Sequence, residues 1–207
     1  MKNFLILGFL LSFRFVLADS PLTSTYFADA YKNEKIIQYA QKRQGKIDRK
    51  LIRFISSEKA SLELKLACIN ALGWNIDNQS NAPLLLKTLL KNNKCYTRDE
   101  LMQRGDAKDL LCYAYLLSLD NYHDVEMAKI ISQIAVDNEP NSYTFQIING
   151  LIQAQYLFDS DWCEVYRVCD NVRSNSQLKD DFSPKAKEII FEYMDLYSSY
   201  CEEKKGH

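Results

Sequence analysis

The chain has 207 residues, of which 47% are hydrophobic and 26% are charged, and its formal net charge at pH 7 is −1. This composition excludes a disordered chain and a bundle of membrane helices. Lysine and arginine do not gather into a basic patch, so a nucleic-acid partner, which requires clustered cations, is also excluded.

Residues 1–18 have the pattern of a signal peptide. Lys2 provides a positive start, residues 4–13 are apolar, and the run from Val16 to Ala18 resembles a cleavage site. The apolar run is too short to cross a bilayer, which takes about 20 residues. A secreted or periplasmic protein with no transmembrane segment after cleavage is therefore expected. Arg14 fits this pattern poorly, and a buried N-terminal helix is the alternative.

Three helices are predicted in the first part of the mature chain, after an N-terminal extension at residues 19–32. Residues 33–44 favour a helix that ends at Gly45, because glycine is common just after helix C-termini. Residues 48–56 favour a second helix, which Asp48 can cap. A longer helix follows Ser57, where apolar residues recur at steps of three and four: Leu62, Leu66, Ile69 and Leu72.

From there, pairs of helices recur along the chain. Each expected pair consists of a long apolar helix, a polar turn and a second helix. The expected pairs cover residues 57–90, 110–134 and 145–172, with Pro83 in the first turn of a helix. The turns contain Asp77, Asp120 and Asp159, about 40 residues apart, and their polar side chains are expected to cap the incoming helices.

This spacing resembles that of the HEAT and tetratricopeptide classes of helical repeats, over roughly residues 57–175. The fixed signature of the tetratricopeptide repeat is absent. The resemblance implies an all-α fold of stacked antiparallel helical hairpins, an α-solenoid-like array, with residues 92–106 as a longer loop between repeats. An irregular helical bundle is the alternative.

The last predicted helix runs from about Pro184 to Glu203. Ser183 and Pro184 are typical of a helix start, and the helix is expected to cap the open end of the array. The helical-repeat domain would then cover residues 33–203. Residues 204–207 form a charged tail that is expected to fray.

The six cysteines all lie in the mature part of the chain. They are Cys68, Cys95, Cys112, Cys163, Cys169 and Cys201. An even number of cysteines in an exported chain predicts disulfides, here one or two, with the other cysteines in the core. Cys163 and Cys169 are expected to face different sides of one helix and not to bond with each other.

No catalytic, cofactor-binding or metal-binding residue is predicted. His123 and Asp124 lie in an expected hairpin turn, where a solvated capping role is the simpler interpretation. The run from Asp159 to Asp161 begins like a calcium loop but lacks the required glycine, so helix capping explains it better. A solvated helix face is the preferred interpretation of three carboxylates at helical spacing: Glu188, Glu192 and Asp195.

Aromatic residues are the remaining candidates for a binding surface: Tyr113, Tyr115, Tyr122 and Trp162. Tyrosine and tryptophan dominate interface hot spots, so any of the four that is exposed would contribute to a binding surface, but core packing is expected for most of them. The expected function is an exported, non-enzymatic module that binds another protein, either as an envelope adaptor or assembly factor or as an immunity-type inhibitor of a toxin. A hydrolase with carboxylates assembled across helices and a structural envelope protein are the alternatives.

Overall fold

The computed structural model describes residues 19–74 and 80–203, and this part of the chain holds eleven α-helices, two short 3₁₀ helices and no strand. The all-α prediction is confirmed. The helices are η1 (Phe27–Tyr31), α1 (Lys35–Gln41), α2 (Arg49–Ile55), α3 (Leu62–Leu72), α4 (Asn81–Asn92), α5 (Arg98–Arg104), α6 (Ala107–Asp120), α7 (Glu126–Asn138), α8 (Tyr143–Leu157), α9 (Trp162–Ser174), α10 (Pro184–Met194), η2 (Asp195–Tyr197) and α11 (Ser199–Glu203). The predicted signal peptide, Asp77 and the tail at residues 204–207 lie outside the described residues.

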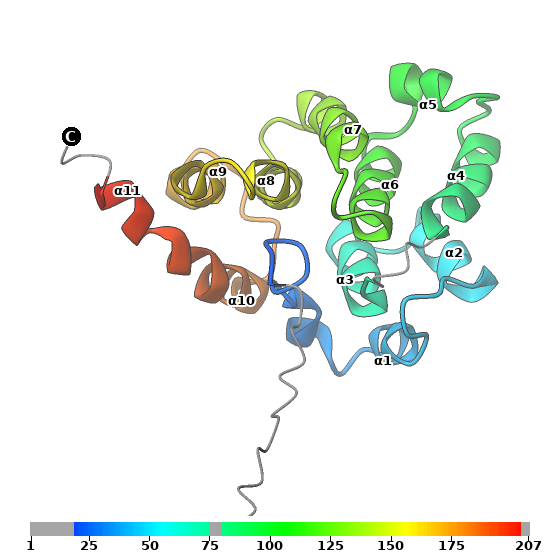
Figure 1. The fold of residues 1–207 in the computed structure, drawn as a ribbon. Helices are drawn as coiled ribbons and strands as arrows, with labels where there is room; N and C mark the ends of the chain where they lie inside the picture. The colour runs from blue at the N-terminus through cyan, green and yellow to red at the C-terminus, as the bar shows by residue number, and fades with distance from the viewer. Residues whose placement is uncertain (1–18, 75–79, 204–207) are drawn as a thin grey trace, which may run out of the picture.

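Successive helices pack side by side through the second half of the chain (Figure 1). Helix α6 packs on α7, α7 on α8, and α8 on α9. The pairs α6–α7 and α8–α9 correspond to the second and third predicted hairpins. The first predicted hairpin, which would pair α3 with α4, differs in its packing. Helix α4 packs mainly on α6, whereas α3 packs mainly on α1, η1 and α6.

Helix starts follow local sequence rules. The Asp48 side chain accepts hydrogen bonds from the N–H groups of Lys50 and Leu51, and Asp161 caps α9 in the same way. One helix lies inside residues 92–106, where a loop was predicted. Helix α5 begins after Thr97, whose hydroxyl oxygen accepts from the N–H of Glu100 at 3.1 Å. The Glu100 carboxylate in turn accepts from the N–H of Tyr96 at 2.8 Å, so a reciprocal capping arrangement stabilises this short helix.

Residues 19–32, the predicted N-terminal extension, contribute side chains to the core. Leu22, Phe27 and Ala28 are fully buried. The Phe27 ring lies 6.1 Å from that of Tyr115 on α6 and 5.5 Å from that of Phe182, which precedes α10. Helix η1 of this segment packs on both α3 and α10, so burial of these apolar side chains stabilises the segment against the rest of the fold.

The N-terminal segment is fixed by Asn70, a buried polar residue of α3. Its amide oxygen accepts from the N–H of Ala28 at 2.9 Å, and its amide nitrogen donates to the carbonyl of Thr25 at 3.1 Å. The same nitrogen donates to the hydroxyl of Tyr115 on α6 at 2.9 Å. One side chain therefore satisfies the main chain of an irregular segment and joins it to two helices.

Asn81 repeats this arrangement at the start of α4. Its amide oxygen accepts from the N–H of Ile47 at 2.9 Å, and its nitrogen donates to the carbonyl of Gly45 at 2.8 Å and to Asp120 of α6 at 2.9 Å. The other carboxylate oxygen of Asp120 accepts from the N–H of Ala82 at 2.6 Å. Asp120 thus caps α4, which is distant in sequence, and not α7, the helix that follows it in the chain. Burial of Asp120 raises the pKa of its carboxyl group.

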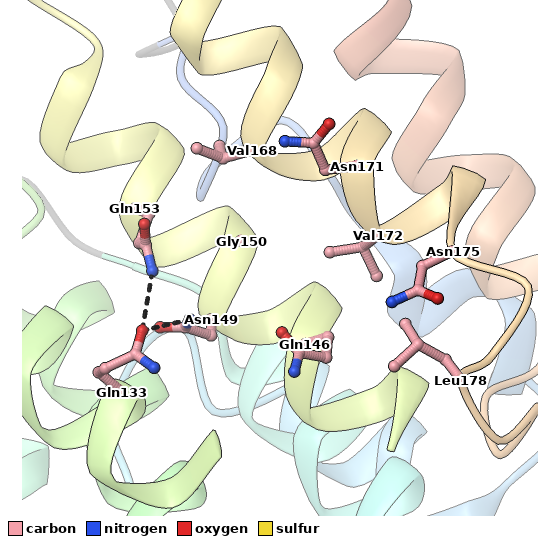
Figure 2. A pocket seen from close by; sticks show the side chains of 10 residues that line it. All are labelled: Gln133, Gln146, Asn149, Gly150, Gln153, Val168, Asn171, Val172, Asn175 and Leu178. Carbon is pink, nitrogen blue, oxygen red and sulfur yellow. Dashed lines mark hydrogen bonds between the residues drawn. The ribbon is translucent and has the colours of Figure 1, made fainter. Parts of the chain in front are cut away.

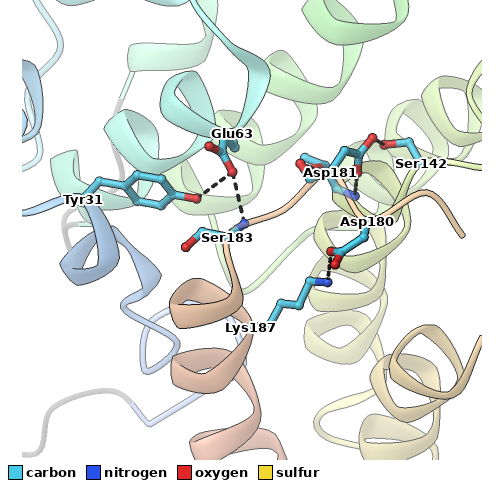
Figure 3. Close-up of polar contacts among 8 residues, drawn as sticks. Tyr31, Glu63, Ser142, Asp180, Asp181, Ser183 and Lys187 are labelled. Carbon is cyan, nitrogen blue, oxygen red and sulfur yellow. Dashed lines mark hydrogen bonds and ion pairs between the residues drawn. The ribbon is translucent and has the colours of Figure 1, made fainter.

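A polar junction connects the two ends of the array (Figure 3). One carboxylate oxygen of Glu63 on α3 accepts from the hydroxyl of Tyr31 at 3.0 Å and from the N–H of Ser183 at 3.1 Å. Nearby, Asp181 accepts from the Ser142 hydroxyl at 2.8 Å and so holds the segment before α10 to the start of α8.

The predicted final helix at residues 184–203 is broken. Helix α10 ends at Met194, the 3₁₀ helix η2 follows, and α11 starts at Ser199. Helix α10 also packs on η1 at the other end of the chain. It therefore closes the array onto its N-terminal segment as well as covering α9.

Replacing Asn70 by alanine should lower the free energy of unfolding by about 2–4 kcal/mol, because three buried groups lose their partner. Chemical denaturation measures this loss. Asn138→Ala is the control, since Asn138 is exposed and bonds only within its own helix, and its cost should stay below about 0.5 kcal/mol. Equal costs for the two variants would contradict the role given to Asn70.

Candidate functional site

Two of the four aromatic candidates are core residues. Tyr113 and Tyr115 are 4% and 0% exposed, so they cannot form a binding surface. They lie on α6, which is buried on most of its circumference because α3, α4, α7 and α8 surround it. Burial also raises the pKa of the Tyr115 hydroxyl, which bonds to Asn70.

Tyr122 lies at the edge of a surface pocket of about 380 Å³. Its ring packs edge-on against Trp74, with 5.0 Å between centroids, and lies 4.1 Å from the His123 ring. The pocket is lined by residues from the second and third predicted hairpin turns, among them Asp124 and Asp159. The Tyr122 and His123 rings pack on each other at its rim.

Trp162 is exposed and, together with Tyr200, forms what we call the aromatic patch; Leu196, four residues before Tyr200 in the chain, is also exposed. Trp162 is 43% and Leu196 is 65% exposed. The Trp162 ring meets Tyr200 edge-on at 4.7 Å and donates its N–H to the carbonyl of Phe158 at 2.7 Å. The patch therefore includes residues from the start of α9 and from α11.

A disulfide lies directly beside this patch. Cys163, next to Trp162, is bonded to Cys201, next to Tyr200, across a sequence separation of 38 residues. The bond fixes α11 to the start of α9 and with it the two aromatic rings of the patch. Disulfides form and persist in oxidising compartments, so this pair indicates such an environment.

The other candidate cysteines are buried free thiols in the described chain: Cys68, Cys95, Cys112 and Cys169. The structure therefore pairs two of the six predicted cysteines, and Cys163 does not bond to Cys169, as expected. Burial raises the pKa of Cys68, Cys112 and Cys169 to about 12 in each case. Protonated thiols are poor nucleophiles, so these three behave as core residues.

Two of the three carboxylates at helical spacing on α10 and η2, Glu188 and Asp195, form ion pairs with different cations. Glu188 bonds to Lys185 at 2.8 Å, and Asp195 bonds to Arg173 of α9 at 2.9 Å. Within residues 19–74 and 80–203, no three histidine, cysteine, aspartate or glutamate side chains group in a way that could hold a metal ion.

The structure also forms a groove that the sequence analysis missed (Figure 2). The amide-lined groove has a volume of about 310 Å³ and runs over α7, α8, α9 and the segment after α9. Six amide side chains line it: Gln133, Gln146, Asn149, Gln153, Asn171 and Asn175. Val168, Val172 and Leu178 add apolar surface to the lining, which we call its floor, and none of the described residues that line the groove is charged. The i, i+4 spacing of Asn149 with Gln153 and of Asn171 with Asn175 was visible in the sequence.

Comparison with known proteins identifies no relative. No family model matches the chain, and neither the curated proteins nor the solved structures contain a significant match. Among the described residues, no helix combines the length and the apolar character that crossing a membrane requires.

Replacing Cys163 and Cys201 together by serine should lower the free energy of unfolding by about 2–4 kcal/mol, since the bond closes a long loop. In a Trp74→Phe background, the emission of Trp162 should also shift to longer wavelength, because Tyr200 is released from the ring. Fluorescence-monitored denaturation measures both effects.

The control for this pair is Cys95→Ser, which should leave the emission wavelength unchanged. Mass mapping of the non-reduced protein provides a second check. Failure to find a peptide that links Cys163 to Cys201 in protein from an oxidising compartment would overturn the pairing.

Proposed function

We propose that this chain is an exported, non-enzymatic module that binds another protein through the aromatic patch. The observation that carries the proposal is an exposed tryptophan, Trp162, held against Tyr200 by the neighbouring disulfide. Tryptophan and tyrosine provide most hot-spot energy at protein interfaces. A surface that is ordered before binding loses less conformational entropy when its partner arrives.

Export rests on two independent features. The first 18 residues have a positive start, an apolar run and a cleavage-like sequence. The Cys163–Cys201 disulfide fits the oxidising compartment to which such a signal leads. A secreted or periplasmic location follows as part of the proposal.

The remaining chemistry favours binding over catalysis. His123 is exposed and packs on Tyr122, and two of the three carboxylates at helical spacing are ion-paired, Glu188 with Lys185 and Asp195 with Arg173. Within the binding class, an envelope adaptor or assembly factor and an immunity-type inhibitor differ only in the partner. If the partner is a toxin, the chain acts as an inhibitor. If the partner is a subunit of an envelope complex, the chain acts as an adaptor or assembly factor.

The experiment is affinity capture of the tagged chain, expressed with its own signal, followed by mass spectrometry and titration of the purified partner. Trp162→Ala should weaken binding of that partner by about 2 kcal/mol, roughly 30-fold, because it removes the centre of the patch. Leu196→Asp should also weaken binding, by placing a charge at the interface.

Tyr96→Ala is the matched control. Tyr96 is an aromatic residue of 87% exposure before α5, remote from the patch, and its removal should leave the affinity unchanged. An empty capture with the unaltered chain, or equal affinity of the Trp162→Ala variant, would contradict the proposal.

A further inference from the structure

The amide-lined groove has hydrogen-bonding capacity that the chain itself leaves open. Gln133 accepts from Asn149 at 3.2 Å and from Gln153 at 3.3 Å, which orients these two side chains along one wall (Figure 2). Among the hydrogen bonds of the described residues, none uses the amide oxygen of Gln153 or any atom of the Asn171 amide on the opposite wall.

The α9 wall has the spacing of an extended polypeptide. Asn171 lies on α9, and Asn175 follows the last residue of this helix, four positions later. Four residues of α-helix advance by about 6 Å. Main-chain groups that face the same way in an extended strand recur every two residues, at about 6.6–6.8 Å. On α8, the amide of Asn149 already accepts from Ser132 and donates to Gln133, so Gln153 offers the open group of that wall. A strand laid in the groove can therefore meet Asn171 and Asn175 at successive repeats on one wall and Gln153 on the other.

Amide side chains already recognise main chain elsewhere in this molecule. Asn70 accepts from the N–H of Ala28 and donates to the carbonyl of Thr25. Asn81 makes the same pair of bonds to Ile47 and Gly45. In both cases a carboxamide, which has a donor and an acceptor side by side, satisfies an irregular segment that has no strand partner.

We propose that the amide-lined groove binds an extended, uncharged polypeptide segment of another protein through its main-chain N–H and carbonyl groups. Alternate small apolar side chains of that segment rest on the floor formed by Val168, Val172 and Leu178. A charged side chain would lose hydration there without meeting a counter-charge, because no charged residue lines the groove. The lining also contains no aromatic ring on which a sugar could stack.

This inference rests on the proposed role in protein binding, but it concerns a surface separate from the aromatic patch. Trp162 and Asn171 lie nine residues apart on α9, which places them on opposite faces of that helix. The groove can therefore be tested alone, without the natural partner.

The test is an NMR titration of the isotope-labelled protein, read at the side-chain amide signals. The probe is a pool of acetylated, amidated octapeptides in which serine alternates with valine or alanine. We expect saturable shifts of the Asn171, Asn175 and Gln153 signals. The Gln153→Leu, Asn171→Leu double variant should weaken binding about tenfold or more, since two hydrogen-bonding groups are lost.

The matched control is the Asn92→Leu, Gln103→Leu double variant, which changes an exposed Asn and an exposed Gln outside the groove and should bind like the unaltered chain. The same peptides with alternate main-chain nitrogens methylated should not bind. Equal binding of the methylated peptides, or no groove shift at millimolar peptide, would overturn the proposal.

Shifts produced by maltohexaose or cellohexaose in place of the peptides would assign the groove to glycans and likewise overturn it. Trp162→Ala should leave the titration unchanged. If the octapeptides do not bind, only the proposal for the groove is contradicted. If affinity capture recovers no partner, the proposed function is contradicted.

Discussion

Buried irregular main chain must find hydrogen-bond partners, and in this fold two asparagines provide them. Asn70 binds the N–H of Ala28 at the start of η1 and the carbonyl of Thr25 before it. Asn81 binds the N–H of Ile47 and the carbonyl of Gly45. Both asparagines are anchored to α6, by Tyr115 and by Asp120. Leaving such groups unpaired would cost about 1–3 kcal/mol each. Helix α6 is thus the central element against which the N-terminal segment and the start of α4 are positioned, and the helices that form the outer surfaces are arranged around it.

The first and last parts of the described chain pack against each other. In an open helical stack each unit contacts only its neighbours. Here η1 packs on both α3 and α10, and Glu63 receives hydrogen bonds from Tyr31 and from Ser183. The first and last parts of the described chain therefore share one core, and further units cannot be added at that side without breaking these contacts. The similarity to helical repeats holds for neighbour packing of the later helices and does not extend to this closure.

The features that could be predicted from the sequence are those set by residues close together in the chain, such as helix starts. The helices after Asp48 and Asp161 were predictable because these side chains cap them, and α5 could have been found from the Thr97–Glu100 pair. Burial of Tyr113 and Tyr115 agrees with the core packing expected for most of the aromatic candidates, because an apolar helix such as α6 is buried around most of its circumference. Which aromatic side chain stays exposed depends on distant elements. The partner of Cys163 and the groove also depend on distant elements. Asn171 and Gln153 taken singly look like ordinary solvated helix residues.

The two proposed surfaces share α9 but depend on different contacts. The aromatic patch depends on α11, which the disulfide at Cys163 fixes, so reduction of that bond alters the patch. The groove depends on the close approach of α8 to α9 at Gly150, where an added Cβ would lie 3.3 Å from the carbonyl oxygen of Val168 and 3.4 Å from the sulfur of Cys169. A side chain at position 150 would require the neighbouring main chain of α9 to shift by a few tenths of an ångström, while the patch at the start of α9 keeps its disulfide. Because these supports are physically separate, a substitution that alters one surface need not alter the other.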